Sequence, residues 1–459
     1  MNHSTTTSGA WPEVRRTLQL AAPVMIGLVA GFAMNFIDTV MAGRLPEKEV
    51  ALAALATGGA LWSAVLMVVI GLLMAVQPAV AHLDGAGEFG EAGAVTRQGF
   101  WIALALGLPF FCVTWFGGHI LAFMRVDPVI IPVAEDYLEP LAFGAPLMCM
   151  VLLLRFYSEG SGHTRPTMYI GIIGVLLNIP FNWVLMFGHL GFPAMGARGC
   201  GMATSLAIGV QALALFIYVR SHSHYREFRL FERWDWPDLV RIRELLRVGW
   251  PIAGTLFVEG SLFVAAALLI GRLGPVQAAA HLVAINFSAL LFMLPLGLGS
   301  AVTTRVGNAL GRGDPAGARQ AGMIGLRLVL VTQTLGMSLI LLFPEAIVAI
   351  YTSDAAIAGL AASLLMYAAI FQLPDGIQIC AAGILRGYKD TFVPMLINVF
   401  SYWLLGLSLG YWLTFAGGRG PAGMWIGMIA GLSAGALLLS LRFFYRSRQL
   451  LSQLAVPGP

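Results

Sequence analysis

The sequence predicts an all-α polytopic membrane protein with twelve transmembrane helices in two six-helix bundles. The first observation is composition: 58% of the 459 residues are hydrophobic and 11% are charged, whereas soluble globular proteins carry about 25% charged residues. So few charges cannot cover the surface of a soluble fold of this size, and this composition also excludes disorder. The second is a series of long apolar runs, where a β-barrel would show alternating segments of about ten residues. The third is an internal repeat.

Apolar stretches long enough to cross a bilayer recur along the chain. A hydrocarbon core about 30 Å thick requires roughly 20 apolar residues in each spanning helix. The expected helices cover residues 17–43, 51–81, 96–123, 130–155, 166–188, 198–220, 248–271, 276–305, 318–344, 355–386, 391–416 and 420–444. The polar N-terminal residues lack the pattern of a cleaved signal peptide, so the first stretch is expected to be an uncleaved span.

The basic residues divide unequally between the two sides of these spans. Alternate loops place 21 of the 27 Lys and Arg residues on the side of both termini and six on the other. Because Lys and Arg favour the cytoplasm, both termini and the Arg-rich segment 221–247 are predicted to be cytoplasmic. Membrane topology therefore accounts for the net charge of +4 without a nucleic-acid partner.

The two halves of the chain resemble each other at an offset of about 227 residues. Gly43-Arg44-Leu45 recurs as Gly271-Arg272-Leu273, and Gly201-Met202 recurs as Gly423-Met424. Because each copy holds six helices, an even number, both insert with the same orientation. The copies are therefore expected to be related by a pseudo-twofold axis along the membrane normal, as in many secondary transporters.

The repeat predicts an N-terminal bundle at residues 1–220, a linker at 221–247 and a C-terminal bundle at 248–459. The linker is rich in arginine and carries Trp234 and Trp236. An amphipathic segment lying at the membrane surface and a regulatory role both remain open for it.

Three acidic residues, Asp38, Glu259 and Asp375, lie well inside the predicted spans. An ionisable group in hydrocarbon costs about 2.5–3.5 kcal/mol on insertion scales, so such residues usually mark a pathway or a coupling site. None of the three has a charged counterpart at the repeat-related position. The scaffold is duplicated, but its chemistry differs between the halves.

Asp38 is predicted to belong to a polar cluster in the outer part of the N-terminal bundle. It precedes the basic residue Arg44 by six positions, which places it roughly 9 Å inside the outer boundary. Thr204 lies at a similar depth, and Asn178 and Asn182 share one helix face. Desolvation disfavours an ionised carboxyl there, which makes Asp38 a candidate proton carrier. The alternative is that these groups only hydrogen-bond the helices together.

Glu259 and Asp375 are predicted to lie near the midplane, roughly 16–18 Å from the inner boundary. Two carboxylates at one depth can bind a hard cation, share protons or pair with a cationic substrate. Gln372 lies close to Asp375 in the sequence, and Asn286 adds a polar group on a neighbouring span.

Motifs typical of enzymes are absent or misplaced. Residues 85–90 match GxGxxG, but no strand precedes them and they fall in a loop, so a nucleotide site is rejected. The sequence has no HExxH and no Walker A motif, and its four cysteines are expected to be small buried side chains. Glycines at four-residue spacing between Gly423 and Gly435 are expected to let the last helix pack closely against a neighbour. No enzyme activity and no cofactor are expected.

Four segments of the sequence carry a recognisable set of motifs: Phe36-Ile37-Asp38-Thr39-Val40-Met41-Ala42-Gly43-Arg44, Asn178-Ile179-Pro180-Phe181-Asn182, Gly199-Cys200-Gly201-Met202-Ala203-Thr204 and Gly383-Ile384-Leu385-Arg386-Gly387-Tyr388-Lys389-Asp390-Thr391. Together they resemble one transporter family, the MATE multidrug and toxin extrusion proteins of the NorM-type branch. The likeness extends over essentially the whole chain.

This resemblance implies an antiporter that exports lipophilic, often cationic drugs and dyes in exchange for H⁺ or Na⁺ by alternating access. It further implies a monomer in the bacterial inner membrane. By position, the resemblance assigns an N-lobe ion-coupling network to Asp38, Asn178, Asn182 and Thr204, and a C-lobe cation site to Glu259 and Asp375. The candidate ion- or substrate-binding residues of the C lobe further include Asn286, Phe371 and Gln372.

One departure from the family pattern concerns the coupling ion. Some NorM-type members have a tyrosine four residues before the C-lobe aspartate, where this sequence has Phe371. Without that oxygen, a Na⁺ site at Glu259 and Asp375 has fewer ligands, which favours coupling to protons. The alternative function is a flippase for lipid-linked oligosaccharides of the same superfamily, which would be expected to carry arginines in its cavity. The sequence places no arginine deep in a span.

Overall fold

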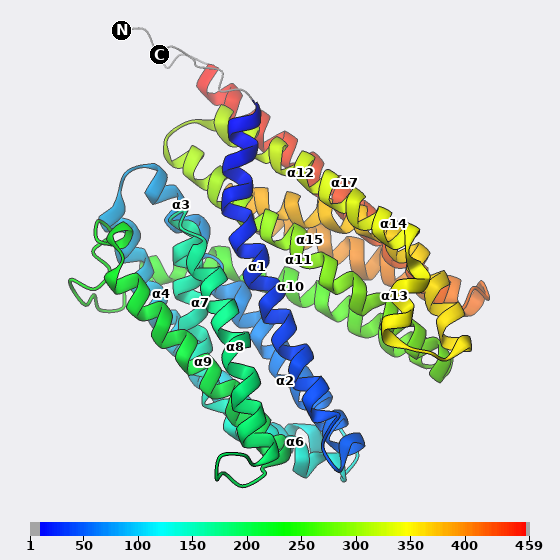
Figure 1. Ribbon diagram of the computed structural model, residues 1–459. Helices are drawn as coiled ribbons and strands as arrows, with labels where there is room; N and C mark the ends of the chain where they lie inside the picture. Colours follow the sequence, from blue (N-terminus) through cyan, green and yellow to red (C-terminus); the bar gives the residue numbers. More distant parts are fainter. Residues whose placement is uncertain (1–9, 456–459) are drawn as a thin grey trace. The chain divides into compact units, whose positions relative to one another are not determined.

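The computed structural model describes residues 10–455, which form helices joined by short turns and contain no strand (Figure 1). The helices of the first half, in chain order, are α1 (Ala10–Ala42), α2 (Lys48–Leu73), α3 (Val76–Gly85), α4 (Phe89–Trp115), α5 (Gly117–Phe123), α6 (Ile130–Ala142), α7 (Gly144–Gly160), α8 (Arg165–Phe187), α9 (Gly196–Ser221) and the short η1 (Ser223–Tyr225). Those of the second half are α10 (Leu239–Gly271), α11 (Pro275–Gly311), α12 (Pro315–Leu342), α13 (Pro344–Tyr351), α14 (Ala355–Gly387), α15 (Phe392–Val399), η2 (Phe400–Leu407), α16 (Ser408–Tyr411), η3 (Trp412–Ala416) and α17 (Pro421–Ala455).

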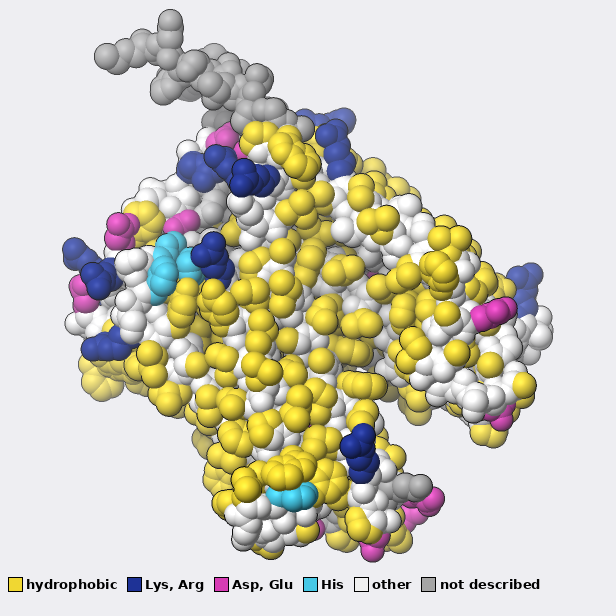
Figure 2. All heavy atoms as spheres, in the orientation of Figure 1, with side chains coloured by type: hydrophobic (Ala, Val, Ile, Leu, Met, Phe, Trp, Pro, Cys, Tyr) yellow, Lys and Arg dark blue, Asp and Glu magenta, His cyan; other side chains and the backbone are white. Residues whose placement is uncertain are grey.

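Within the described residues, 11 helical segments are long and apolar enough to cross a membrane. The pair α6 and α7, bent by 50° at its junction, gives a twelfth span when it is counted as one. Apolar side chains cover the helices along most of their length, and charged side chains gather near helix ends (Figure 2). The predicted all-helical, twelve-span fold is confirmed.

The fourth span is longer than predicted. The sequence predicts its end at Arg155, but α7 continues to Gly160. The Arg155 Nε lies 2.7 Å from the Glu159 Oε1, one helical turn further on. Because this pair neutralises both charges within the helix, the arginine does not mark its end.

The eleventh span, Phe392–Ala416, contains two π-helical stretches, η2 and η3, which the sequence does not predict. Beside them, the glycines of α17 allow a close approach, as predicted. A Cβ atom on Gly427 would lie 2.3 Å from the Cα of Gly410, and one on Gly431 would lie 2.6 Å from the carbonyl oxygen of Ser401. Any side chain at these two positions would collide with backbone.

The chain divides into two compact units. The N unit spans Ile26–Ala253, and the C unit combines residues 10–25 with residues 254–455. Both boundaries fall inside a long helix, between Met25 and Ile26 in α1 and between Ala253 and Gly254 in α10. Each unit therefore contains the first turns of the helix that opens the other half of the sequence, and the linker lies wholly within the N unit.

Candidate functional site

In the N unit, the carboxylate of Asp38 accepts hydrogen bonds from side chains of two other helices. Asn178 and Asn182 of α8 donate their Nδ2 groups to the Oδ1 atom of Asp38 at 3.0 and 2.6 Å. Thr204 of α9 donates its Oγ1 hydroxyl to the Oδ2 atom at 3.2 Å. All four side chains are buried. The structure thus brings together the four residues that the sequence singled out in this half.

Close helix packing allows these short side chains to reach one another. A Cβ atom on Gly171 of α8 would lie 2.6 Å from the carbonyl oxygen of Gly27 on α1, and one on Gly199 of α9 would lie 2.4 Å from that of Leu185 on α8. Small residues at these contacts let the three helices approach closely. The two asparagines are one turn apart on α8, and Asn182 Nδ2 also donates to Asn178 Oδ1 at 3.0 Å.

Two further residues belong to the Asp38 cluster, and neither is among the predicted site residues. Cys200, one turn before Thr204 on α9, is buried and lies close enough to the Asp38 carboxylate to interact with it electrostatically. The expectation of small buried cysteines is confirmed for Cys149, Cys200 and Cys380 and wrong for Cys112, which is partly exposed. Tyr137 of α6 lies close enough to interact electrostatically with Asp38 and Cys200. Spacing from Thr204 was the available signal for Cys200, whereas nothing in the sequence pointed to Tyr137.

In the C unit, Glu259 of α10 and Asp375 of α14 lie close enough to interact electrostatically, and both are buried. Gln378 and Arg386, both on α14, lie within electrostatic reach of the Glu259 carboxyl, but neither donates a hydrogen bond to it. Tyr402, in the π-helical η2, lies within electrostatic reach of both carboxyls. Tyr402 is not predictable from the sequence, because helical periodicity does not indicate the π-helical backbone that carries it.

This cluster contains many buried polar atoms without a hydrogen-bond partner among the described residues. They include both carboxyl oxygens of Glu259, Oδ1 of Asp375, the amide of Gln378 and the hydroxyl of Tyr402. Buried polar groups in folded proteins are almost always paired. An unpaired set of mainly oxygen atoms is chemically suited to hold protons or to accept a cationic group. Across the described residues, no three His, Cys, Asp or Glu side chains are placed to hold a metal ion.

The other three C-unit candidates make contacts with residues other than the two carboxyls. Phe371 is buried against Trp425, with ring centroids 5.6 Å apart, and supplies no oxygen. Gln372 accepts hydrogen bonds from Gln333 of α12, at 2.9 Å to its carbonyl and 3.2 Å to its Oε1 atom. Asn286 donates to the Leu282 carbonyl on its own helix at 2.9 Å.

A fourth buried carboxyl, Glu159, was overlooked because it lies beyond the predicted end of its span. Besides Arg155, it accepts a hydrogen bond from Thr167 Oγ1 at 3.0 Å. Its charge is therefore compensated within the N unit, in contrast to the carboxyls of the C unit.

A duplicated, twelve-span helical fold with a different set of buried carboxyls in each half is typical of a membrane transporter. The MatE family model matches the chain twice, at residues 23–184 and 251–412, which confirms the internal repeat. The chain belongs to the MATE family, and it is therefore a multi-pass membrane transporter and not an enzyme.

Named relatives align over nearly the full length. The chain is 44% identical over 438 residues to the probable multidrug resistance protein NorM of Xanthomonas campestris, covering 95% of both chains. It is 42% identical over 446 residues to the multidrug resistance protein PmpM of Pseudomonas aeruginosa, covering 96% of this chain and 93% of that one.

Solved structures of MATE transporters share the fold. A multidrug resistance MATE family transporter in an outward-facing conformation matches with a TM-score of 0.88 at 20% identity, over 98% of this chain and 100% of that chain. The eukaryotic MATE transporter AtDTX14 matches with a TM-score of 0.86 at 20% identity, over 97% of this chain and 100% of that chain.

Proposed function

We propose that this protein is a secondary active multidrug antiporter that exports lipophilic, often cationic compounds in exchange for inward-moving protons. It works by alternating access as a monomer in the bacterial inner membrane, with both termini in the cytoplasm. The observation that carries the proposal is the buried Asp38 network in a chain whose relatives, named as multidrug resistance proteins, align over 95% of its length.

Proton uptake by Asp38 is the coupling step in this proposal. As a carboxylate, Asp38 accepts hydrogen bonds from α8 and α9. A protonated carboxyl is itself a donor and accepts fewer bonds, so protonation changes the links between α1, α8 and α9 and biases one of two arrangements of the unit. One charge that moves inward across 100 mV supplies about 2.3 kcal/mol, which is enough for modest uphill export.

Glu259 and Asp375 form the second functional site in this proposal, where a cationic substrate or protons bind. Their unpaired oxygens supply negative charge without a fixed partner. Phe371 lines the same region but supplies no ligand for Na⁺, which prefers several oxygen atoms. Proton coupling is therefore favoured over sodium coupling.

The coupling step is tested with everted membrane vesicles, whose cytoplasmic face is outward, and a cationic dye added to the medium. Proton and sodium gradients are imposed separately, each with the cation concentrated in the lumen, and dye uptake is measured. The wild-type protein is expected to transport dye under the proton gradient alone, and Asp38→Asn is expected to lose this transport while remaining folded by size-exclusion chromatography. If Asp38→Asn keeps pH-driven transport, the coupling role is wrong. If only the sodium gradient drives transport, the proposed coupling ion is wrong.

The C-unit site is tested with the double variant Glu259→Gln/Asp375→Asn. Dye affinity is expected to fall at least tenfold, because both negative charges are lost while the side-chain volumes are kept. Arg155→Lys serves as a matched control that conserves charge outside this site. Unchanged dye affinity and unchanged ion dependence in the double variant would show that the two carboxyls are only structural.

A further inference from the structure

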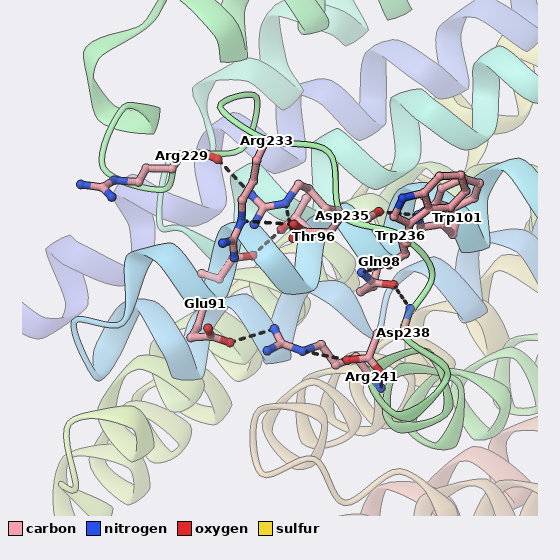
Figure 3. Close-up of polar contacts among 12 residues, drawn as sticks. Glu91, Thr96, Gln98, Trp101, Arg229, Arg233, Asp235, Trp236, Asp238 and Arg241 are labelled. Atoms are coloured by element: carbon pink, nitrogen blue, oxygen red, sulfur yellow. Dashed lines mark hydrogen bonds and ion pairs between the residues drawn. The ribbon is translucent and has the colours of Figure 1, made fainter.

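Part of the linker, residues 222–240, is fixed against α4 of the N unit (Figure 3). Arg97, which is buried on α4, places its Nε atom 2.6 Å from the Asp235 Oδ2 atom. The same guanidinium donates a hydrogen bond from its Nη1 atom to the Arg229 carbonyl oxygen at 2.9 Å. A Cβ atom on Gly93 would lie 1.9 Å from the Phe228 carbonyl oxygen, so the linker backbone packs directly on the helix.

Two more α4 side chains pair with the non-helical backbone that follows. Gln98 donates through Nε2 to the Trp236 carbonyl at 3.1 Å, and its Oε1 accepts from the Asp238 amide at 2.8 Å. The Trp101 indole donates to the Asp235 carbonyl at 3.0 Å. Irregular backbone is tolerated near hydrocarbon only where protein groups satisfy its hydrogen bonds. Within residues 235–238, α4 side chains satisfy the Asp235 carbonyl, the Trp236 carbonyl and the Asp238 amide in this way.

The opposite face of this segment is apolar and exposed. Trp234 and Trp236 are 66% and 80% exposed, and Leu239 and Val240 are 77% and 68% exposed. The Trp236 indole stacks on Trp101, with ring centroids 6.4 Å apart (Figure 3). The Trp234 indole meets the Trp101 ring edge-on, with centroids 5.5 Å apart. Exposed apolar groups gathered in this way mark an interaction surface.

The apolar face of α4 continues this surface. Leu104 and Leu108, both exposed, follow Trp101 at three and seven positions, so all three lie on one side of a membrane-spanning helix. Gln98 lies about 26 Å along the helix from Trp115, at 1.5 Å per residue. That distance is close to the ~30 Å thickness of the hydrocarbon core, which places the linker contact at one membrane interface.

We propose that residues 234–240 form an interfacial anchor that inserts Trp234, Trp236, Leu239 and Val240 into the phospholipid headgroup and acyl-chain boundary beside α4. Tryptophan prefers this zone, where its ring is in contact with acyl chains and its N–H with polar groups. Arg233, exposed immediately before Trp234, shares the Asp235 carboxylate with Arg97, at 3.1 and 2.6 Å. Two guanidinium groups and one carboxylate leave a net positive charge for lipid phosphate on the same side. The occupant of this surface is thus the bilayer, and Arg97, Gln98 and Trp101 are the residues that position the anchor.

The test uses the full-length protein in phosphatidylcholine/phosphatidylglycerol nanodiscs. Tryptophan emission of the wild type is compared with that of Trp234→Phe/Trp236→Phe, in lipids brominated either near the headgroup or deep in the acyl chain. The difference in emission between the wild type and the variant is the contribution of Trp234 and Trp236. This contribution is expected to fall at least twofold in lipids brominated near the headgroup and to fall less in lipids brominated deep in the acyl chain. Phenylalanine keeps an aromatic ring at both positions, and size-exclusion chromatography verifies folding.

The control is Trp62→Phe, which removes a buried indole packed against Phe110 in the same unit. The contribution of Trp62 to the emission, obtained in the same way, is expected to change little in either brominated lipid. If the Trp234 and Trp236 emission is likewise insensitive to brominated lipid, the proposal is overturned. Quenching of that emission by aqueous iodide would then identify the segment as a water-facing surface.

Discussion

Among the residues around Asp38, Thr204 allows the most conservative test of a single hydrogen bond. Thr204→Val keeps the shape of the side chain and removes the hydroxyl that donates to Asp38 Oδ2 at 3.2 Å. Loss of a hydrogen bond to a charged group costs about 1.5–3 kcal/mol, so the melting temperature in detergent and the rate of proton-driven dye efflux are both expected to fall. Thr204→Ser keeps the donor and is expected to stay within twofold of wild type. Equal behaviour of the two variants would exclude a role for the hydroxyl.

Glu159 and Arg155 form an ion pair that stabilises the fold only while both partners are present. Arg155→Met leaves the buried Glu159 carboxyl without its cationic partner at 2.7 Å. Breaking such a pair costs about 3 kcal/mol when the remaining charge is buried. Thermal unfolding in detergent should therefore show a clear loss of stability for Arg155→Met and partial recovery in Arg155→Met/Glu159→Gln. A double variant no more stable than the single one would contradict this account.

At the scale of elements, the packing of α17 against α16 depends on glycine at particular turns. Gly427→Ala places a methyl group 2.3 Å from the Cα of Gly410, where backbone cannot move aside cheaply. Overpacking of this kind costs about 1–3 kcal/mol. The expected result is a lower melting temperature and lower yield of folded protein. Gly435→Ala is the control, because its methyl group would lie 3.5 Å from the nearest atom, Tyr402 Cε1, at ordinary contact distance.

The turn between α7 and α8 packs on η1 through three histidines. His163 lies with its ring centroid 4.7 and 4.9 Å from those of His222 and His224, and its Nε2 atom is 2.9 Å from the Tyr218 hydroxyl. Burial first, and then the neighbouring His224, His222 and Arg165, lower the pKa of His163 to about 4. The neutral ring is therefore the form that this contact stabilises.

This lowered pKa predicts the direction of a pH effect on stability. The contribution of His163 is fully present above its unfolded pKa of about 6.5 and is lost as the pH falls towards 4, because the unfolded state binds the proton more tightly. Between pH 7 and pH 5, the melting temperature is expected to fall less in His163→Gln than in the wild type. His119→Gln, at an exposed position, should follow the wild-type curve. Parallel curves for His163→Gln and wild type would refute the assignment.

At the scale of the whole molecule, composition and hydropathy were sufficient to predict the fold, since twelve apolar spans leave few alternatives. The cluster around Asp38 was accessible because a carboxyl in an apolar helix is rare and its depth can be counted from the helix end. Cys200 was missed because a thiol resembles a small apolar side chain, and Glu159 because its pairing with Arg155 extends a helix past a charged residue. The π-helical segment 400–407 depends on packing that no local pattern records.

The orientation of the whole chain in the membrane is predicted from its charge distribution. With 21 of 27 basic residues on the side of both termini, a reversed topology would place most of the arginines in the periplasm. Alkaline phosphatase, which is active only outside the cytoplasm, is therefore expected to be active when fused after Val126, in the turn before α6, and inactive when fused after Gly162, in the turn before α8. Green fluorescent protein fused to the C-terminus should fluoresce. The opposite pattern of activities would invert the topology and place the Asp38 network, which is predicted to lie in the periplasmic half of the membrane, in the cytoplasmic half.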